Sequence, residues 1–290
     1  MLPDTQYYSS RRPDIFHAQT DWVARHEASL NVAGVLHVGD LVDNPGDPVQ
    51  WEVANSAMRR LDEARVPYVV VPGNHDTGAA REGLMGRYFS PRNMPWIAGT
   101  ASPDEVSNSY ALIDVGARKW VIVGLEFGPR DDVLAWAGEV LRTYRSLPAV
   151  VVTHAYLHVD GSRYDYAARG LSQAFAPRMY GYTTDQGIND GEDVWRKLVS
   201  PNLNVLLVFC GHDPGIARLT SVRGGAPVHQ VLSDYQWSDE LGGSGYLRLL
   251  TFDYDRREVV VETYSPYLDR YLTDDANQFT LDLGECPCEK

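Results

Sequence analysis

The sequence predicts an α/β protein with two packed β-sheets, and two observations lead to this prediction. In the first two-thirds of the 290-residue chain, stretches with a helical spacing of apolar residues alternate with short β-branched runs. After about residue 215 only short strand patterns follow, and we expect them to form antiparallel strands packed on the first sheet. No repeat and no low-complexity linker interrupts the sequence. We therefore expect a single domain over residues 1–290, of which about the last 20 residues can be a tail or linker.

Helices and strands are expected in alternation along the first part of the chain. Apolar residues share one helical face in residues 14–30, 49–64, 133–144 and 194–199. Each of these stretches is followed by an apolar strand, at residues 32–38, 67–71, 149–153 and 205–210. This order is typical of βα units and a largely parallel sheet. Further strands are expected as a hairpin of residues 110–114 and 119–125, and then at residues 217–222, 228–232, 246–253 and 259–264.

Composition excludes several classes of partner. The formal net charge of −13 argues against non-specific binding to nucleic acid or to an anionic membrane. No run of about 18 apolar residues occurs, so no membrane-spanning helix is expected. Three cysteines are too few for a disulfide-framed adhesion domain. Residues 1–6 lack the charged start and apolar stretch of a signal peptide, and the compartment and the oligomeric state stay open.

Polar side chains follow four of the predicted strands at the point where each strand ends. Because the carboxyl ends of parallel strands lie along one edge of a sheet, these side chains are expected to converge. Each group alone also fits an ordinary turn or a buried, hydrogen-bonded histidine. Their recurrence at the same end of successive strands favours a functional site, with Asp4 and Gln6 in a similar position near the N-terminus. The groups are Asp40 and Asp43, then Asn74, His75 and Asp76, then His154, and finally His212 and Asp213.

These residue types suit a two-metal hydrolase. Carboxylates, an amide carbonyl and neutral imidazoles form a mixed oxygen and nitrogen site that favours Mn, Fe or Zn. A carboxylate can bridge two ions, and paired ions about 3.5–4 Å apart can stabilise both the attacking and the leaving oxygen of a phosphoryl transfer.

Taken together, the motifs resemble those of the calcineurin-like metallophosphoesterases in residue type, order and approximate spacing, over about residues 4–265. The resemblance implies a four-layer αββα sandwich, which agrees with the two sheets predicted above. It also implies hydrolysis of a small-molecule phosphoric ester, either a diester or a monoester, with two divalent metal ions. The motifs that carry it are Gly39-Asp40-x-x-Asp43, Gly73-Asn74-His75-Asp76, His154 and Gly211-His212.

The same resemblance implies metal ligands. Asp40 would bridge the two ions, and Asn74, His154 and His212 would complete the second site. Asp4 would bind the first ion.

Catalytic roles follow from the resemblance as well. His75 would be the general acid or would stabilise the transition state, and Asp76 would orient its imidazole. Asp43 would support the loop. The nucleophile would be a metal-bound hydroxide. No substrate-binding residue is assigned.

Two departures from the family pattern concern the first metal. The family opens with Asp-x-His and closes with Gly-His-x-His, where this chain has Gln6 and Pro214 in place of the two histidines. Gln6 and Asp213 can offer oxygen atoms instead. We hypothesise that the first ion has mostly oxygen and water ligands, binds more weakly and prefers a harder metal.

A second function class remains open because of these departures. The chain could be a catalytically weak metal-binding protein of the same fold that acts as a binding module. His75 and Asp76 favour the enzyme, since a pure binding protein does not need them.

Two further features of the sequence are open at this stage. Only three residues precede Asp4 where the family has a longer strand, so either the N-terminus is truncated or the sheet lacks part of that strand. The segment 155–190 has no clear period and is expected to form a lid that helps to select the substrate. Its tyrosines, Tyr156 and Tyr164 among them, either line a cleft or cap the core.

Overall fold

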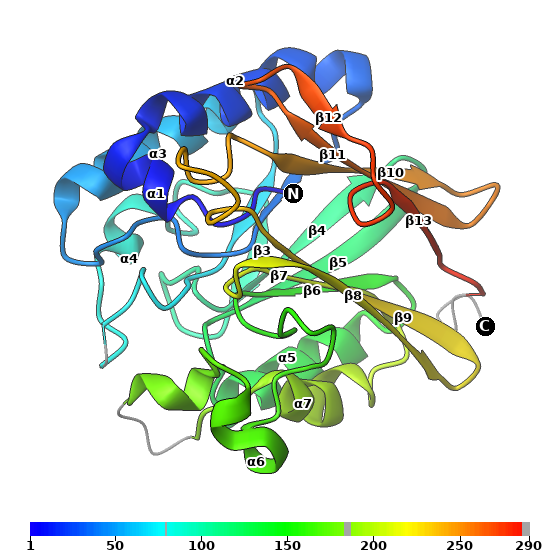
Figure 1. The fold of residues 1–290 in the computed structure, drawn as a ribbon. Coiled ribbons are helices and arrows are strands. Elements are labelled where there is room, and N and C mark those ends of the chain that lie inside the picture. The colour runs from blue at the N-terminus through cyan, green and yellow to red at the C-terminus, as the bar shows by residue number, and fades with distance from the viewer. Residues whose placement is uncertain (79, 183–186, 286–290) are drawn as a thin grey trace.

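Two β-sheets lie face to face, and helices cover the outer face of each sheet (Figure 1). This computed structural model describes residues 1–78, 80–182 and 187–285. The arrangement confirms the predicted α/β class and the four-layer αββα sandwich. The strands of the site belong to both sheets, so the packing of the two sheets positions the functional side chains.

The larger sheet has seven strands in the order β3-β4-β5-β6-β7-β9-β8. Its central strands β5, β6, β7 and β9 run parallel, and antiparallel partners extend the sheet at both edges. The predicted hairpin is formed by β4 and β5. The bounds are Ile97–Thr100 (β3), Ser109–Val115 (β4), Arg118–Leu125 (β5), Ala149–Thr153 (β6), Val205–Cys210 (β7), Gly215–Arg223 (β8) and Ala226–Asp234 (β9).

The second sheet is assembled around the N-terminal residues. Leu2 forms a parallel bridge with His37, and the Met1 amino group donates a hydrogen bond of 2.6 Å to Arg248 O. Residues 1–3 therefore link the parallel pair β1 and β2 to the antiparallel strands β10 and β11. Both β12 and β13 pair with the far side of β11. The bounds are Val35–His37 (β1), Tyr68–Val70 (β2), Leu247–Asp253 (β10), Glu258–Ser265 (β11), Arg270–Leu272 (β12) and Phe279–Asp282 (β13).

The final stretch of the chain is not only a tail. Strand β13 lies within the last 20 residues and pairs antiparallel with β11, from Glu258↔Asp282 to Val261↔Phe279. Leu281 is buried and packs in the core between the sheets. This part of the expected tail or linker therefore belongs to the fold.

Helices α1, α2 and α3 cover the second sheet, and α5, α7 and a π-helix cover the larger one (Figure 1). The four predicted helices are present with small shifts at their ends. Helix α3 begins where Asp47 accepts a hydrogen bond from Val49 N and Pro48 occupies the first turn. The bounds are Gln6–Arg11 (α1), Pro13–Leu30 (α2), Pro48–Glu63 (α3), Asp131–Thr143 (α5), Gly191–Val194 (α7) and Trp195–Val199 (π).

Short helices lie in the loops, and α1 was not predicted. Among them are α4 (Met85–Tyr88), α6 (Tyr166–Arg169) and two 3₁₀ turns, Gly170–Ser172 and Pro177–Tyr180. Helix α1 begins at Gln6 without a side-chain cap, so the usual signal for a helix start is missing from the sequence.

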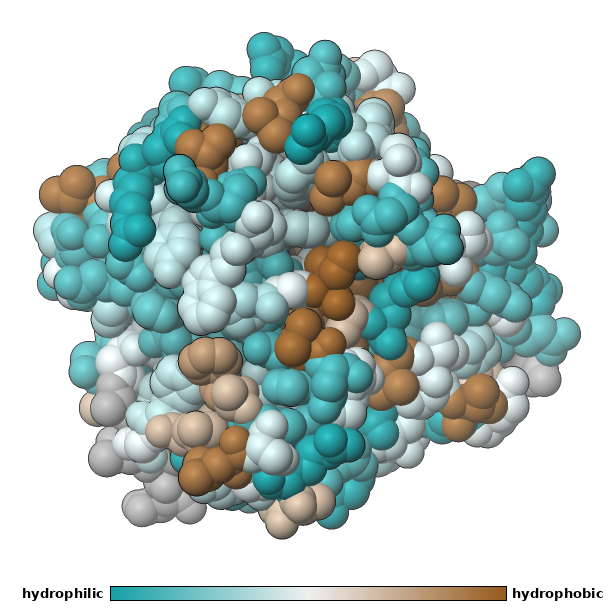
Figure 2. Space-filling model, in the orientation of Figure 1, coloured by the Kyte–Doolittle hydropathy of each residue, from teal (hydrophilic) through white to brown (hydrophobic). Residues whose placement is uncertain are grey.

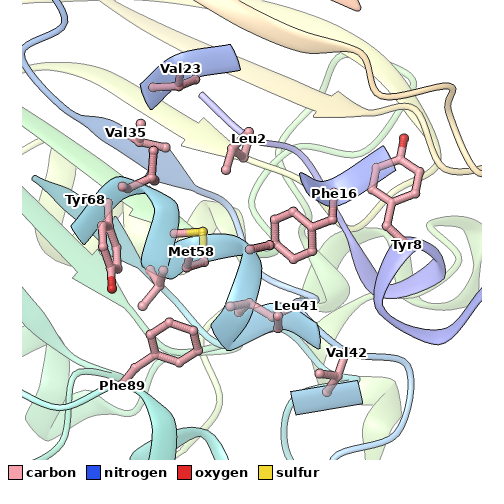
Figure 3. Close-up of a cluster of buried hydrophobic side chains, with 14 of the residues drawn as sticks. Leu2, Tyr8, Phe16, Val23, Val35, Leu41, Val42, Met58, Tyr68 and Phe89 are labelled. Atoms are coloured by element: carbon pink, nitrogen blue, oxygen red, sulfur yellow. The ribbon is translucent and has the colours of Figure 1, made fainter. Parts of the chain in front are cut away.

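Three hydrophobic cores fill the three spaces between the four layers. Strand β5 shows the alternation that separates them: Val121 and Val123 face the helices, whereas Ile122 faces the other sheet. The core under α2 and α3 contains Phe16, Met58 and other side chains that point toward one another in Figure 3. Because β6 and β7 are buried at every position, the ends of these two strands are held rigidly.

One face of the molecule is mostly hydrophilic (Figure 2). Figure 2 shows separate hydrophobic patches on a face dominated by hydrophilic residues. Within the described residues, no helix combines the length and apolar character needed to cross a membrane.

Candidate metal centre

Four strand ends bring their polar residues together as predicted. Asp40, His154 and His212 each offer one ligand atom, and these atoms all lie within 4.8 Å of one another. The three residues follow β1, β6 and β7, and all are buried. Asn74, which follows β2, joins them through an Oδ1 atom 3.2 Å from His154 Nε2.

The ring of His154 presents a lone pair to this group. Its Nδ1 lies 2.8 Å from Val38 O, and because a carbonyl oxygen can only accept, Nδ1 carries the proton in the neutral ring. Nε2 is then an acceptor, and it lies 3.2 Å from Asp40 Oδ2 and 3.2 Å from Asn74 Oδ1. Three electron-rich atoms therefore face one another.

His212 adds a fourth electron-rich atom to this group. Its Nε2 lies 2.7 Å from Phe175 O and donates to it, so its Nδ1 holds a lone pair and lies 3.2 Å from His154 Nε2. Facing acceptors repel unless a proton or a cation lies between them. The donor set, one carboxylate, one amide oxygen and two imidazole nitrogens, fits a divalent transition metal.

The electrostatics favour an ionised Asp40 and a neutral His212, both able to bind a metal, whereas His154 tends to hold a proton. Burial, with a contribution from His154, lowers the pKa of His212 to about 3, so its ring is neutral. Burial opposes ionisation of Asp40, but the charge and hydrogen bond of His154 lower its pKa to about 2. Burial also opposes the charged ring of His154, yet Asp40 outweighs this and raises its pKa. A proton on His154 can thus occupy the place of a cation.

Two of these four residues have strained backbone. Asp40 has φ 52° and His212 has φ 78°, the left-handed region that residues other than glycine rarely adopt. Such strain costs of order 1–3 kcal/mol and is typical of functional sites. The strain turns both side chains toward the shared space at the strand ends.

Gly73 makes room for Asp40. A Cβ at this position would lie 2.0 Å from Asp40 Oδ1 and 2.6 Å from Asp40 N. We expect Gly73→Ala to displace the carboxylate and to lower the free energy of unfolding by about 1–3 kcal/mol. Thermal unfolding checks this, with Gly86→Ala as the control, because a Cβ on Gly86 meets nothing within 4 Å. Equal stability of both variants would contradict the close approach.

The structure corrects the role expected for Asp76. Its carboxylate accepts hydrogen bonds from the backbone N–H groups of Leu41 (3.1 Å), Val42 (3.0 Å) and Gly73 (2.9 Å). Asp76 therefore joins the loop after β1 to the loop after β2, and it does not orient His75.

Asp43 contacts His75 instead. His75 Nδ1 lies 3.0 Å from Asp43 O and 3.5 Å from Asp43 Oδ1. The His75 side chain is 40% exposed, so its other nitrogen can reach a bound molecule. Sequence reasoning placed Asp43 in the loop and missed this contact, since the loop geometry depends on the anchoring by Asp76.

Asp4 and Gln6 lie beside the centre with unpartnered oxygens. Asp4 Oδ2 accepts a hydrogen bond of 3.0 Å from His212 N. The other oxygen, Asp4 Oδ1, and the side-chain oxygen Gln6 Oε1 are buried and have no hydrogen-bond partner among the described residues. The Gln6 amide nitrogen donates to Gln236 Oε1.

Gln236 and Asp234, which the sequence analysis did not single out, are linked to Gln6 by hydrogen bonds. Gln236 donates hydrogen bonds to Asp234 from its backbone N (2.8 Å) and its Nε2 (2.7 Å). Asp234 ends β9, which runs parallel to β7. The rule applied to the other strand ends would have found it, but the strands after residue 215 were all expected to be antiparallel.

The segment 155–190 contacts the centre through its backbone and its aromatic residues. Phe175 O binds His212, and Tyr180 and Tyr182 pack against Phe127. Tyr156 and Tyr164 are fully buried, so they belong to the core and do not line a cleft. Residues 183–186 of this segment lie outside the described residues.

His37 makes folding sensitive to acid. Its Nδ1 accepts from Gly39 N (3.2 Å) and its Nε2 lies 3.0 Å from Thr5 Oγ1, and burial lowers its pKa to about 3. The unfolded chain takes up this proton near the ordinary value of 6.5, so stability falls as pH drops from about 6.5 to about 3. We expect His37→Gln to have a lower free energy of unfolding than the wild type at pH 7. On acidification this variant should lose less of that free energy than the wild type does. Denaturant unfolding of the metal-free protein at several pH values measures this, and parallel pH profiles would refute it.

Comparisons with known proteins identify the family. The sequence model of the calcineurin-like phosphoesterase family matches residues 2–215. The uncharacterized protein YvnB of Bacillus subtilis (strain 168) is 34% identical over 301 residues, covering 97% of this chain and 21% of that relative. The chain thus spans only 21% of the length of that relative.

A solved structure shares the fold. The crystal structure of a dimetal phosphatase from Danio rerio matches with a TM-score of 0.52 and 12% identity, covering 94% of this chain and 90% of that one. At this identity the likeness concerns the fold alone.

Proposed function

The chain belongs to the calcineurin-like phosphoesterase family, and on that premise we propose that it is a metal-dependent hydrolase of phosphoric esters. The observation that carries the proposal is the set of facing acceptors around His154 Nε2, with Asp40, Asn74 and His212 each 3.2 Å away. A divalent ion relieves their repulsion, whereas a purely structural polar cluster would pair donors with acceptors.

Each residue of the centre has a proposed task. Asp40, Asn74, His154 and His212 would hold one ion, and Asp40 would be shared with a second. When bound, such ions supply Lewis acidity, which lowers the pKa of water and withdraws charge from a phosphoryl oxygen. Burial of Asp40, His154 and His212 excludes bulk water and so strengthens these effects.

His75 is proposed as the general acid. Its Nδ1 donates to Asp43 O, so its Nε2 is the nitrogen that can hold a proton and deliver it to the leaving oxygen. Asp43 Oδ1 stabilises the charged ring that delivery requires. Asp76 supports this arrangement through the backbone of the two loops.

One experiment tests the activity. The purified chain is supplied with Mn²⁺, Zn²⁺ or Mg²⁺, and turnover of a bis-aryl and a mono-aryl phosphate is compared with that of Asn74→Ala and His75→Ala. We expect metal-dependent turnover of at least one ester by the wild type and a large loss in both variants. The ratio of the two esters then decides between phosphodiesterase and phosphatase.

The opposite results are informative as well. If wild type and variants are equally inactive with every metal but still bind it, the chain is the metal-binding module considered above. If Asn74→Ala keeps full activity and metal content, the assignment of Asn74 as a ligand is wrong.

A further inference from the structure

Three aromatic side chains from separate segments of the chain form a row beside the metal centre. Tyr7 lies in α1, Trp237 in the loop that follows β9, and Phe175 in the segment 155–190. The rings of Phe175 and Trp237 are 6.1 Å apart, centroid to centroid, at an angle of 88°. Trp237 Nε1 donates a hydrogen bond of 3.2 Å to Tyr7 Oη. We call these three residues the aromatic row.

Phe175 connects the aromatic row to the centre. Its carbonyl oxygen accepts a hydrogen bond of 2.7 Å from His212 Nε2, and its ring lies 6.3 Å from the His212 ring, centroid to centroid. Its backbone has φ 63°, the left-handed region that a bulky residue rarely adopts. Strained backbone of this kind clusters at functional sites. The row thus begins next to a proposed metal ligand.

The other end of the row is fixed as well. Gln6 and Gln236 directly precede Tyr7 and Trp237, and their buried side chains are joined by a hydrogen bond. Two hydrogen bonds at consecutive positions therefore join α1 to the loop after β9. The orientation of the indole is set before any ligand arrives, which lowers the entropy that binding costs.

Solvent reaches two of these rings although they are held in place. Trp237 is 59% exposed and Phe175 is 39% exposed, whereas Phe127 and Tyr182, which also lie near the centre, are buried and pack on each other. Burial therefore explains the position of the second pair better than that of the first. Rings arranged edge to face, as in the first pair, leave ring surface on which a third planar ring can stack.

We propose that the aromatic row binds a planar aromatic group of the ester substrate while the phosphoryl group lies at the metal centre. This inference rests on the proposed function and names the class of ester, one that carries a nucleobase or an aryl ring close to its phosphorus atom. Phe175 and Trp237 contact that ring. Tyr7 is a positioning residue that orients Trp237 through its hydroxyl group.

The spacing of the row fits such an ester. The His212 ring lies 6.3 Å from the Phe175 ring, which lies 6.1 Å from the Trp237 ring. These steps are of the same order as the distance from a phosphorus atom to a ring that is attached through one oxygen or through a sugar. A phosphoryl group at the centre therefore leaves its aromatic substituent within reach of the row.

Binding of phosphonates tests the row independently of turnover. Benzylphosphonate and ethylphosphonate carry the same anionic group, and only the first has an aromatic ring. Calorimetry on the Mn²⁺-loaded protein should show that benzylphosphonate binds at least about tenfold more tightly. Phe175→Leu and Trp237→Leu should each bring the ratio of the two dissociation constants toward one. Trp237→Phe keeps an aromatic face and should keep most of the preference.

Controls separate this effect from loss of fold or metal. Circular dichroism and metal analysis are applied to each variant. Tyr271→Leu removes a ring of comparable exposure on β12, where it packs against Tyr264, and should leave the preference unchanged. The methylenephosphonate analogue of adenosine 5′-monophosphate identifies the kind of ring. Tighter binding than that of benzylphosphonate indicates a nucleobase, and weaker binding indicates an aryl ester.

Two results would overturn the aromatic row. One is equal affinity of the wild type for benzylphosphonate and ethylphosphonate. The other is an unchanged preference in folded, metal-loaded Phe175→Leu and Trp237→Leu. If the wild type still hydrolyses an ester in either case, the proposed function stands without the row. Absence of turnover with every metal and every ester would instead remove the proposed function, and this inference with it.

Discussion

Asp40→Asn is expected to lower metal-dependent turnover at least about a thousandfold and to remove bound metal from both sites. Asp40 Oδ2 lies 3.2 Å from His154 Nε2, and Asp40 is the carboxylate proposed to be shared by both ions. Asparagine keeps the shape and can still accept the hydrogen bond of 2.9 Å from His75 N. The change therefore removes charge from the centre while preserving the loop.

Metal analysis and steady-state kinetics on the same preparations measure this effect. Asp255→Asn is the matched control, because it removes an equal charge from the surface. The expected control result is unchanged metal content and unchanged turnover. Wild-type metal content in Asp40→Asn would show that this carboxylate is not a ligand.

His75→Gln is expected to reduce kcat about 10²–10³-fold without changing metal content. The reason is that His75 contacts the centre through its backbone N, whereas its half-exposed ring faces outward and bonds to Asp43 O. Removing a general acid lowers kcat most when the leaving oxygen is strongly basic. The loss should therefore grow along a series of aryl phosphates with increasing leaving-group pKa.

The leaving-group series separates proton donation from simple positioning. A loss of kcat that is uniform across the series would mean that His75 only stabilises the phosphoryl group. Asp43→Asn provides a graded comparison, because it removes the carboxylate charge that stabilises the charged His75 ring but keeps the hydrogen bond from His75 to the Asp43 backbone. We therefore expect a smaller loss of kcat than in His75→Gln, with the same dependence on the leaving group. A loss larger than that of His75→Gln would contradict this assignment.

The fold and the convergence of four polar side chains could be predicted because much of both depends on local pattern. Alternating βα periodicity located the strands, and the rule that parallel strands share an edge grouped Asp40, Asn74, His154 and His212. Asp40 and Asn74 follow strands of one sheet and His154 and His212 follow strands of the other, so the packing of the two sheets completes the group. The αββα layering followed from the same pattern together with the family resemblance.

Asp76 and Asp43 could not be assigned in this way. Whether a carboxylate next to a histidine binds that histidine or nearby amides depends on the path of a second loop. Here the N–H groups of Leu41 and Val42 reach Asp76 from the loop after β1, and this leaves His75 to Asp43. Such choices are made by tertiary contacts between residues about 35 positions apart in sequence.

Asp234 was missed for a topological reason. Strand β9 pairs parallel with β7 on one side and antiparallel with β8 on the other. A short strand that follows a hairpin-like neighbour gives no local sign of its parallel partner, so the sequence pattern alone did not place its end at the centre.

The most direct test of the central claim is the position of the metal itself. Crystals of the wild-type protein grown with Mn²⁺ would be measured at the manganese absorption edge, where an anomalous difference map locates the ion. We predict a strong peak within bonding distance of Asp40, Asn74, His154 and His212, and a weaker one toward Asp4. A map at saturating Mn²⁺ with no peak among these side chains would contradict the account.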